Sequence, residues 1–80
     1  MDSQKIKVYS TPTCAYCFAL KDFLKENDIN FEEIDIAVDS DKREEMIKKS
    51  GQMQVPVVDI NGEIVIGFDK EKIKNLLNLK

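Results

Sequence analysis

Two short runs rich in β-branched residues, joined by Asn61-Gly62, most constrain the fold of this chain. The runs cover residues 55–60 and 63–66. Asn-Gly is the preferred two-residue loop of a type I′ hairpin, because both loop positions need a positive φ. The sequence therefore predicts an antiparallel hairpin in this part of the chain.

Ahead of the hairpin, the hydrophobic pattern changes between that of a strand and that of a helix. Residues 5–10 alternate polar and apolar side chains and predict a strand, and residues 29–36 predict a second one. Residues 15–27, between them, have the spacing of an amphipathic helix. Its apolar face consists of Leu20, Phe23 and Leu24.

Two further helices are predicted from capping residues and apolar spacing. One has Asp39 or Ser40 as its N-cap and runs to about residue 50, with Gly51 after its last turn. Because only two strongly apolar residues lie in this segment, we expect most of that helix to be exposed. The other helix begins after Asp69 as its cap. Its core positions are Ile73, Leu76 and Leu77.

The predicted order of elements is β-α-β-α-β-β-α. Two strands joined through a helix favour parallel pairing with a right-handed crossover, and the hairpin adds antiparallel pairing. We therefore expect an α/β fold in which a four-stranded mixed sheet is flanked by three helices. A chain of 80 residues has room for a single domain, which we place at residues 1–80.

Composition excludes several classes of function. The formal net charge is −3, so no basic surface for nucleic acid is indicated. No apolar run reaches the roughly 20 residues of a membrane span, and residues 1–5 lack a signal-peptide pattern, which favours the cytoplasm. Histidine is absent, which removes Ser-His-Asp and Cys-His catalysis and every histidine-containing metal site. The specific chemistry is therefore expected at the two cysteines.

Cys14 and Cys17 form a C-x-x-C sequence where the first strand leads into the first helix. Positions i and i+3 of a helix lie on the same side, close enough for a disulfide. Unpaired N–H groups and the helix dipole would stabilise a thiolate at Cys14, and the thiolate is the attacking species. Cys17 is more shielded and better placed as the second attacker. Lys21, on the same helical face, is expected to be a solvated lysine rather than a charge that acts on the site.

Chance, a zinc site and a structural disulfide account less well for the C-x-x-C sequence. Chance spacing of two structural cysteines does not account for their position at a strand-to-helix junction. A closed zinc site would need further cysteine or histidine ligands, which the chain lacks. A structural disulfide that closes so short a loop would constrain little of the fold. Redox use of the pair is the favoured interpretation.

Three stretches of the chain resemble the glutaredoxins, small members of the thioredoxin superfamily. Residues 11–17 (Thr-Pro-Thr-Cys-Ala-Tyr-Cys) resemble the active-site segment of that family. Residues 54–56 (Gln-Val-Pro) are similar to its Thr-Val-Pro segment, and residues 67–69 (Gly-Phe-Asp) to the glycine-containing turn before its last helix. The resemblance covers essentially the whole chain and agrees with the predicted order of elements.

This resemblance implies a thioredoxin-type fold in which a cis peptide precedes Pro56 and this loop faces the cysteines. The backbone of Val55 would then pair with a bound thiol peptide, as in strand addition. Cys14 would attack a substrate disulfide, and Cys17 would resolve the mixed disulfide. The residues implied to contact substrate or glutathione are Thr13, Tyr16, Gln54, Val55, Pro56, Gly67, Phe68 and Asp69.

Simpler roles for some of these residues stay open. Pro56 also fits the start of an edge strand, because proline cannot donate a ladder hydrogen bond. Tyr16 also fits a side chain that partly covers the helix start, and Asp69 fits an ordinary helix cap.

The chain departs from the usual glutaredoxin pattern at five positions. They are Thr11 for a basic residue, Ala15 for proline, Gln54 for threonine, Phe68 for a second glycine, and Lys70 for an acidic residue. Phenylalanine in the turn is more similar to glutaredoxin-like redoxins that accept electrons from thioredoxin reductase. The resemblance therefore implies glutathione as co-substrate, or thioredoxin reductase with NADPH as the alternative electron source.

The favoured prediction is a monomeric disulfide oxidoreductase with no bound metal or cofactor. Its substrates would be protein disulfides or glutathione mixed disulfides. The alternative from another class is an iron–sulfur carrier, in which two chains share a cluster through Cys14 and glutathione thiols.

Overall fold

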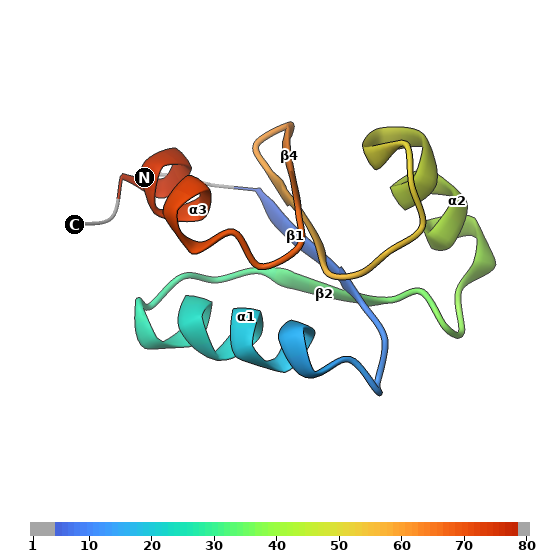
Figure 1. Ribbon diagram of the computed structural model, residues 1–80, viewed down its shortest axis with the longest axis horizontal. Coiled ribbons are helices and arrows are strands. Elements are labelled where there is room, and N and C mark those ends of the chain that lie inside the picture. The colour runs from blue at the N-terminus through green and yellow to red at the C-terminus, as the bar shows by residue number, and fades with distance from the viewer. Residues whose placement is uncertain (1–4, 79–80) are drawn as a thin grey trace.

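Seven elements follow one another in the order that the sequence predicts (Figure 1). The computed structural model describes residues 5–78. The predicted domain covers residues 1–80, so both of its ends lie outside this range. Residues 1–4, from the segment that lacks a signal-peptide pattern, are among the residues outside it. The elements are β1 (Ile6–Ser10), α1 (Ala15–Glu26), β2 (Glu32–Asp35), α2 (Ser40–Ser50), β3 (Val57–Ile60), β4 (Glu63–Ile66) and α3 (Lys70–Leu77).

The strands form a four-stranded mixed sheet in the order β2-β1-β3-β4. β1 pairs in parallel with β2, across the crossover helix α1, and antiparallel with β3. The hairpin of β3 and β4 turns at Asn61 and Gly62, whose φ angles of 52° and 98° match the predicted positive values. The predicted mixed sheet and its three helices are confirmed.

Two predicted strands are shorter in the structure than the apolar pattern suggested. β2 begins at Glu32 rather than at residue 29, because Ile29 and Phe31 pack against the core without joining the ladder. β3 begins at Val57 rather than at residue 55, because the two preceding residues form a separate loop. The apolar residues before each strand thus pack against the core as their character suggests, but they do not pair in the sheet.

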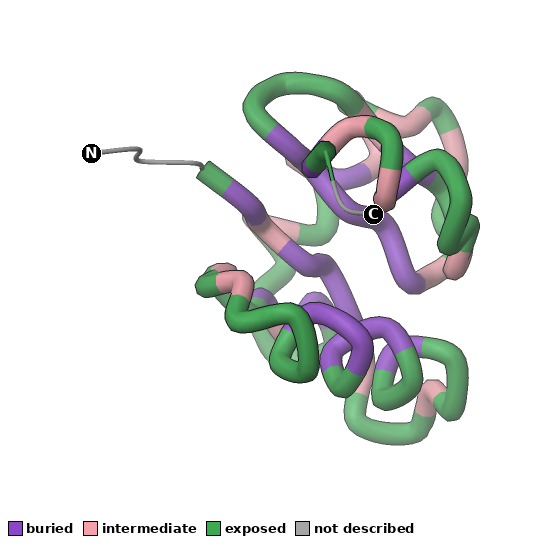
Figure 2. Tube along the Cα trace, turned by 90° about the vertical axis from the view of Figure 1, so that its left-hand side faces the viewer, coloured by how far each residue is buried: buried purple, intermediate pink, exposed green. Residues whose placement is uncertain are grey.

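Helices cover both faces of the sheet (Figure 1). α1 and α3 pack on one face against side chains such as Val8, Val58 and Val65. α2 packs on the other face, where Met46 meets Tyr9. Figure 2 shows buried stretches along the strands at the centre and exposed stretches on the outer sides of the helices. The predicted exposure of α2 is confirmed, since Met46 is its one buried residue.

The predicted helix caps are present. Asp39 and Asp69 are the N-caps of α2 and α3, and each accepts a hydrogen bond from a backbone N–H of the first turn. Gly51 ends α2 with a φ of 76°, the left-handed conformation that glycine adopts without steric cost. Within residues 5–78, no helix is long and apolar enough to span a membrane.

A polar cluster of Tyr9, Glu45, Lys49 and Asp59 holds α2 to the sheet. The Tyr9 hydroxyl, on a residue with 0% exposure, donates a hydrogen bond to Glu45. Lys49 Nζ donates to the Tyr9 hydroxyl oxygen at 3.1 Å and to Asp59 Oδ2 at 2.7 Å. A buried hydroxyl and a nearly buried carboxylate therefore have partners, and both partners come from the same helix.

The hydrogen bond from Tyr9 and the charges of Lys42 and Lys49 lower the pKa of Glu45 from 4.5 to about 2. The hydrogen bond from Lys49 to Asp59 raises the pKa of Lys49 above its ordinary value. Both groups are therefore charged across the whole neutral range. A folded-state pKa below that of the unfolded chain means that ionised Glu45 stabilises the fold.

We predict that Glu45→Gln lowers the free energy of unfolding by about 1 kcal/mol at neutral pH, because it removes a charge-assisted hydrogen bond. The loss should be complete above about pH 5 and shrink as pH falls toward 2, since wild-type Glu45 is then protonated. Urea unfolding at several pH values measures this difference. Glu44→Gln is the matched control, because Glu44 is exposed on the same helix. Equal losses for the two variants at neutral pH would contradict the prediction.

Candidate active site

Cys14 lies at the junction of β1 and α1, where it is the N-cap of the helix. Its sulfur accepts a hydrogen bond from the backbone N–H of Cys17 at 3.1 Å. The first N–H groups of a helix have no partner within the helix, so a side chain at the N-cap position can satisfy one of them. Cys14 is half-buried, and both cysteines are free thiols. The helix start thus holds an accessible sulfur in contact with a backbone donor.

The peptide bond between Val55 and Pro56 is cis, as the resemblance implies. The loop that contains it faces Cys14, since the Val55 carbonyl oxygen lies 4.0 Å from the Cys14 sulfur. Because β3 begins only at Val57, the Val55 backbone lies outside the ladder of described strand pairs. A segment 41 residues further along the chain therefore completes the surroundings of the first cysteine.

Gln52 fixes the cis-proline loop through its side chain, a role that the sequence did not indicate. Its Oε1 accepts from the Gln54 backbone N–H at 2.6 Å, and its Nε2 donates to the Gln54 carbonyl at 3.1 Å. Ser50, at the end of α2, accepts a hydrogen bond from the same Nε2 at 3.2 Å. Neither residue belongs to a motif, so only the folded loop shows what these side chains do.

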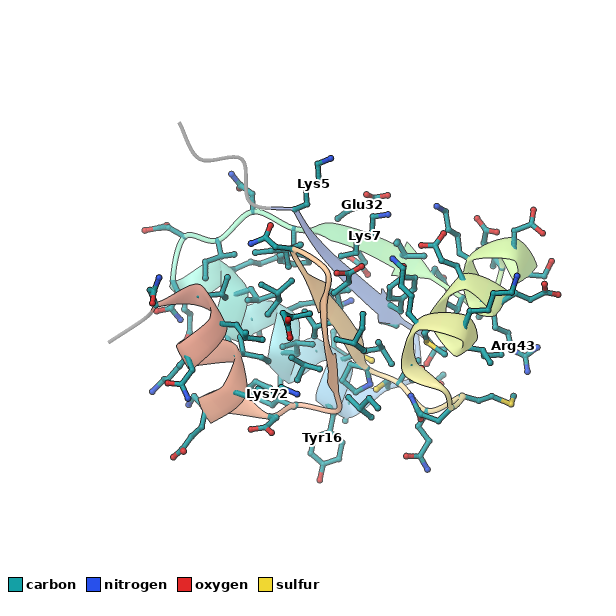
Figure 3. All side chains as sticks on the ribbon, turned by 90° about the horizontal axis from the view of Figure 1, so that it is seen from above. Lys5, Lys7, Tyr16, Glu32, Arg43 and Lys72 are labelled. Atoms are coloured by element: carbon teal, nitrogen blue, oxygen red, sulfur yellow. The ribbon has the colours of Figure 1, made fainter. Side chains whose placement is uncertain are left out.

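The structure brings part of the predicted contact set together. Gly67 joins the loop, because its N–H donates to the Pro56 carbonyl at 2.8 Å and its φ is 81°. Tyr16 is 70% exposed and projects outward near the start of α1 (Figure 3). Thr13, in the cysteine segment, and Gln54, in the cis-proline loop, are both exposed.

Two other predicted contact residues are engaged in the fold. The Phe68 ring packs against Phe23 with centroids 5.9 Å apart, so this side chain belongs to the core edge. Asp69 accepts the Lys72 N–H at 3.3 Å as the cap of α3. Lys70 Nζ lies 5.4 Å from the centre of the Phe23 ring. The turn before α3 thus holds a packed aromatic ring and an exposed lysine where the usual pattern has glycine and an acidic residue.

Cys17 lies one turn into α1 and is fully buried, with 0% exposure. Burial raises its pKa to about 12, and its interaction with Cys14 contributes in the same direction. The expected division between an accessible first cysteine and a shielded second cysteine is therefore present.

The expectation that Lys21 is a solvated lysine is wrong. Lys21 is only 9% exposed, and its Nζ donates to Glu33 Oε2 of β2 at 2.6 Å. The same nitrogen lies 4.8 Å from the centre of the Phe18 ring. Strand β2 supplies the carboxylate that allows this amine to be buried, which spacing within α1 does not reveal.

Two surface hollows of the described chain lie away from the cysteines. Hollows of about 510 and 340 Å³ are both lined by Lys5 and Lys7, and neither is lined by a cysteine. These lysines lie on the opposite side of the view from Tyr16 (Figure 3). The candidate site is the surface where Cys14 meets the cis-proline loop.

A C-x-x-C pair at a helix start, facing a cis-proline loop, is placed here on a thioredoxin-like fold. A crystal structure of a mutant of the thioredoxin-like protein BC3987 matches it with a TM-score of 0.90 and 39% sequence identity, covering 95% of this chain and 97% of that one. The glutaredoxin family model matches residues 6–65. The chain therefore belongs to the glutaredoxin family.

Two relatives agree with this assignment. The uncharacterised glutaredoxin-like 8.6 kDa protein in the rubredoxin operon of Clostridium pasteurianum is 46% identical over 72 residues, 90% of this chain and 96% of that protein. Glutaredoxin 3 of Escherichia coli K12 is 38% identical over 64 residues, 80% of this chain and 77% of that protein. Membership of the family supports a thiol redox function.

We predict that iodoacetamide at neutral pH modifies Cys14 and spares Cys17 in the folded protein. Cys17 is buried, and with a pKa of about 12 it stays protonated at neutral pH, whereas alkylation needs an accessible thiolate. Peptide mass spectrometry after a short exposure measures the two sites separately. Unfolding in urea should make both cysteines reactive. Equal modification of both in the folded protein would show that Cys17 is not shielded.

Proposed function

We propose that the chain is a thiol–disulfide oxidoreductase that uses Cys14 as nucleophile and Cys17 as resolving cysteine. One observation carries this proposal: an accessible sulfur at a helix start has a buried thiol one turn behind it. The substrates would be protein disulfides or glutathione mixed disulfides, and the chain would act as a single-domain monomer. The difference in exposure supports an order of attack in which Cys14 reacts first, because Cys14 is half-buried and Cys17 is fully buried.

The reaction would consist of two thiol–disulfide exchanges. The Cys14 thiolate attacks one sulfur of the substrate disulfide, and the other substrate sulfur leaves as a thiolate. Cys17 then attacks the Cys14 sulfur of the mixed disulfide, which forms the Cys14–Cys17 bond and releases the second substrate thiolate. The substrate gains two electrons and the two cysteines lose them. The Cys17 N–H that contacts Cys14 is placed to stabilise negative charge on that sulfur.

Backbone groups beside Cys14 would orient the substrate. Val55 precedes the paired part of β3 and lies against the Cys14 sulfur, so its backbone is placed to pair with an extended substrate segment. The exposed ring of Tyr16, two residues after Cys14, would offer the substrate an apolar contact. Neither contact requires a deep pocket.

Glutathione is the electron donor that the family typically uses, and we propose it as co-substrate here. Thioredoxin reductase with NADPH is the alternative, because Phe68 and Lys70 change the turn that precedes α3. The Phe68 ring is packed against Phe23 rather than free at the surface. This turn would therefore offer glutathione a different surface from the usual glycine pair.

We predict that Cys14→Ser abolishes turnover of a disulfide substrate, because it removes the attacking sulfur. Cys17→Ser should keep glutathione-linked reduction of a glutathione mixed disulfide, since a second glutathione can replace the resolving cysteine. The same variant should lose reduction of a protein disulfide. Steady-state rates at neutral pH measure these effects. Activity retained in Cys14→Ser would show that the roles are assigned wrongly.

A comparison of two reducing systems tests the function and the donor together. One assay couples the chain to glutathione and glutathione reductase, and the other to thioredoxin reductase and NADPH, with a small disulfide as common substrate. Faster turnover in the first would support glutathione as co-substrate, and faster turnover in the second would support the reductase. Turnover in neither would contradict the proposed oxidoreductase.

A further inference from the structure

Lys21 is the one buried lysine among residues 5–78. Burying an ammonium group costs free energy unless it is paired, and here Glu33 of β2 is the partner at 2.6 Å. Glu33 itself is half exposed, with 52% of its side-chain surface accessible. The pair is therefore asymmetric: water can screen the carboxylate, whereas the amine lies inside.

Cys17 and Lys21 are neighbours on the inner face of α1. They lie four residues apart in the same helix, and both are buried. Side chains at positions i and i+4 of a helix lie next to each other, with Cβ atoms about 5–6 Å apart. The two buried side chains are therefore adjacent on this face, and Lys21 Nζ extends to Glu33 of β2.

The groups around Cys17 act on it in opposite directions. Burial and the interaction with Cys14 raise its pKa, whereas a hydrogen bond with the backbone of Thr11 and the charge of Lys21 lower it. When Cys14 becomes part of a mixed disulfide, it no longer carries the thiol or thiolate that opposes ionisation of Cys17. The influences of Thr11 and Lys21 remain. The second cysteine is therefore harder to ionise before the first attack than after it.

We propose that Lys21 is a positioning residue for the resolving step, in which its buried positive charge promotes formation of the Cys17 thiolate within the mixed disulfide. The inference rests on the proposed function, because it concerns the second of the two exchanges. In that step Cys17 loses its proton to solvent water and its sulfur bonds to the Cys14 sulfur. The bond between Cys14 and the substrate breaks, and the substrate sulfur leaves with the electron pair.

Glu33 makes this proposal distinguishable from a purely structural role. The titratable groups that act on Cys17 are Cys14 and Lys21, and Glu33 reaches Lys21 from β2. If the ion pair only joined α1 to β2, removal of either partner would have the same effect. If the charge of Lys21 matters, neutralising Glu33 leaves that charge unopposed. The two neutralising substitutions should then act in opposite directions.

The experiment uses the full chain and a symmetrical aromatic disulfide that releases a coloured thiolate. In a stopped-flow instrument, attack by Cys14 releases the first thiolate at a rate that depends on the concentration of the disulfide. Resolution by Cys17 releases the second at a rate that does not. Cys17→Ser should show only the first release, which identifies the two phases.

Lys21→Met should slow the second phase by about three- to tenfold at neutral pH, and more than it slows the first. An opposite charge within about 4–6 Å changes a pKa by about 1 to 3, and the low end applies here because Lys21 contributes least of the groups that act on Cys17. A thiolate with a lower pKa is also less nucleophilic, which offsets about half of the effect of that pKa change on the rate. Glu33 already screens part of the charge of Lys21. The rate of the second phase in Lys21→Met should approach that of the wild type as pH rises. Lys21→Arg should restore the second phase, and Glu33→Gln should accelerate it.

The outcomes separate this inference from the proposed function. An unchanged second phase in Lys21→Met, or slowing in Glu33→Gln equal to that in Lys21→Met, would overturn the role of Lys21 while two-phase release still supported the oxidoreductase. Absence of the first phase in the wild type would instead contradict the proposed function itself. If Lys21→Met does not fold by circular dichroism, Glu33→Gln decides alone: acceleration supports the inference and slowing overturns it.

Discussion

The hydrogen bond from the Cys17 N–H to the Cys14 sulfur is the interaction on which the site depends. It begins α1 and at the same time fixes the position of the first sulfur, so the fold and the chemistry share one contact. The sulfur takes the place of the oxygen that usually caps a helix. Any change that moved the start of α1 would therefore move the Cys14 sulfur relative to the cis-proline loop.

The position of that helix start is determined by packing on both faces of β1. Val8 belongs to the core under α1 and α3, while Tyr9, the next residue, lies under α2. Alternation along a single strand thus couples the apolar core to the polar cluster with Glu45. α2 ends at Ser50, and the segment that follows it holds Gln52, whose side chain shapes the cis-proline loop. The start of α1 and the cis-proline loop, which together form the site, are consequently supported from opposite faces of one sheet.

Local features of the sequence predicted most of the fold. The Asn61-Gly62 turn and the caps Asp39 and Asp69 are determined by backbone conformation and hydrogen bonds within a few residues, so the sequence alone indicated them. The cis peptide before Pro56 followed only from the resemblance, since proline at that position also suits an edge strand. Burial of Lys21 could not be predicted, because its partner comes from another element whose register is set by tertiary pairing.

The two thiols differ because each is controlled by a different kind of environment. Cys14 is held by a backbone donor at the surface, whereas Cys17 is controlled by burial and by charges inside. A pair with equal reactivity would have no defined order of attack, and either sulfur would react first. In the proposed reaction, the first exchange would remove the influence of Cys14 that opposes ionisation of Cys17, while the charge of Lys21 would remain. The order of the two exchanges would therefore follow from the helix start itself, without a histidine or any other base.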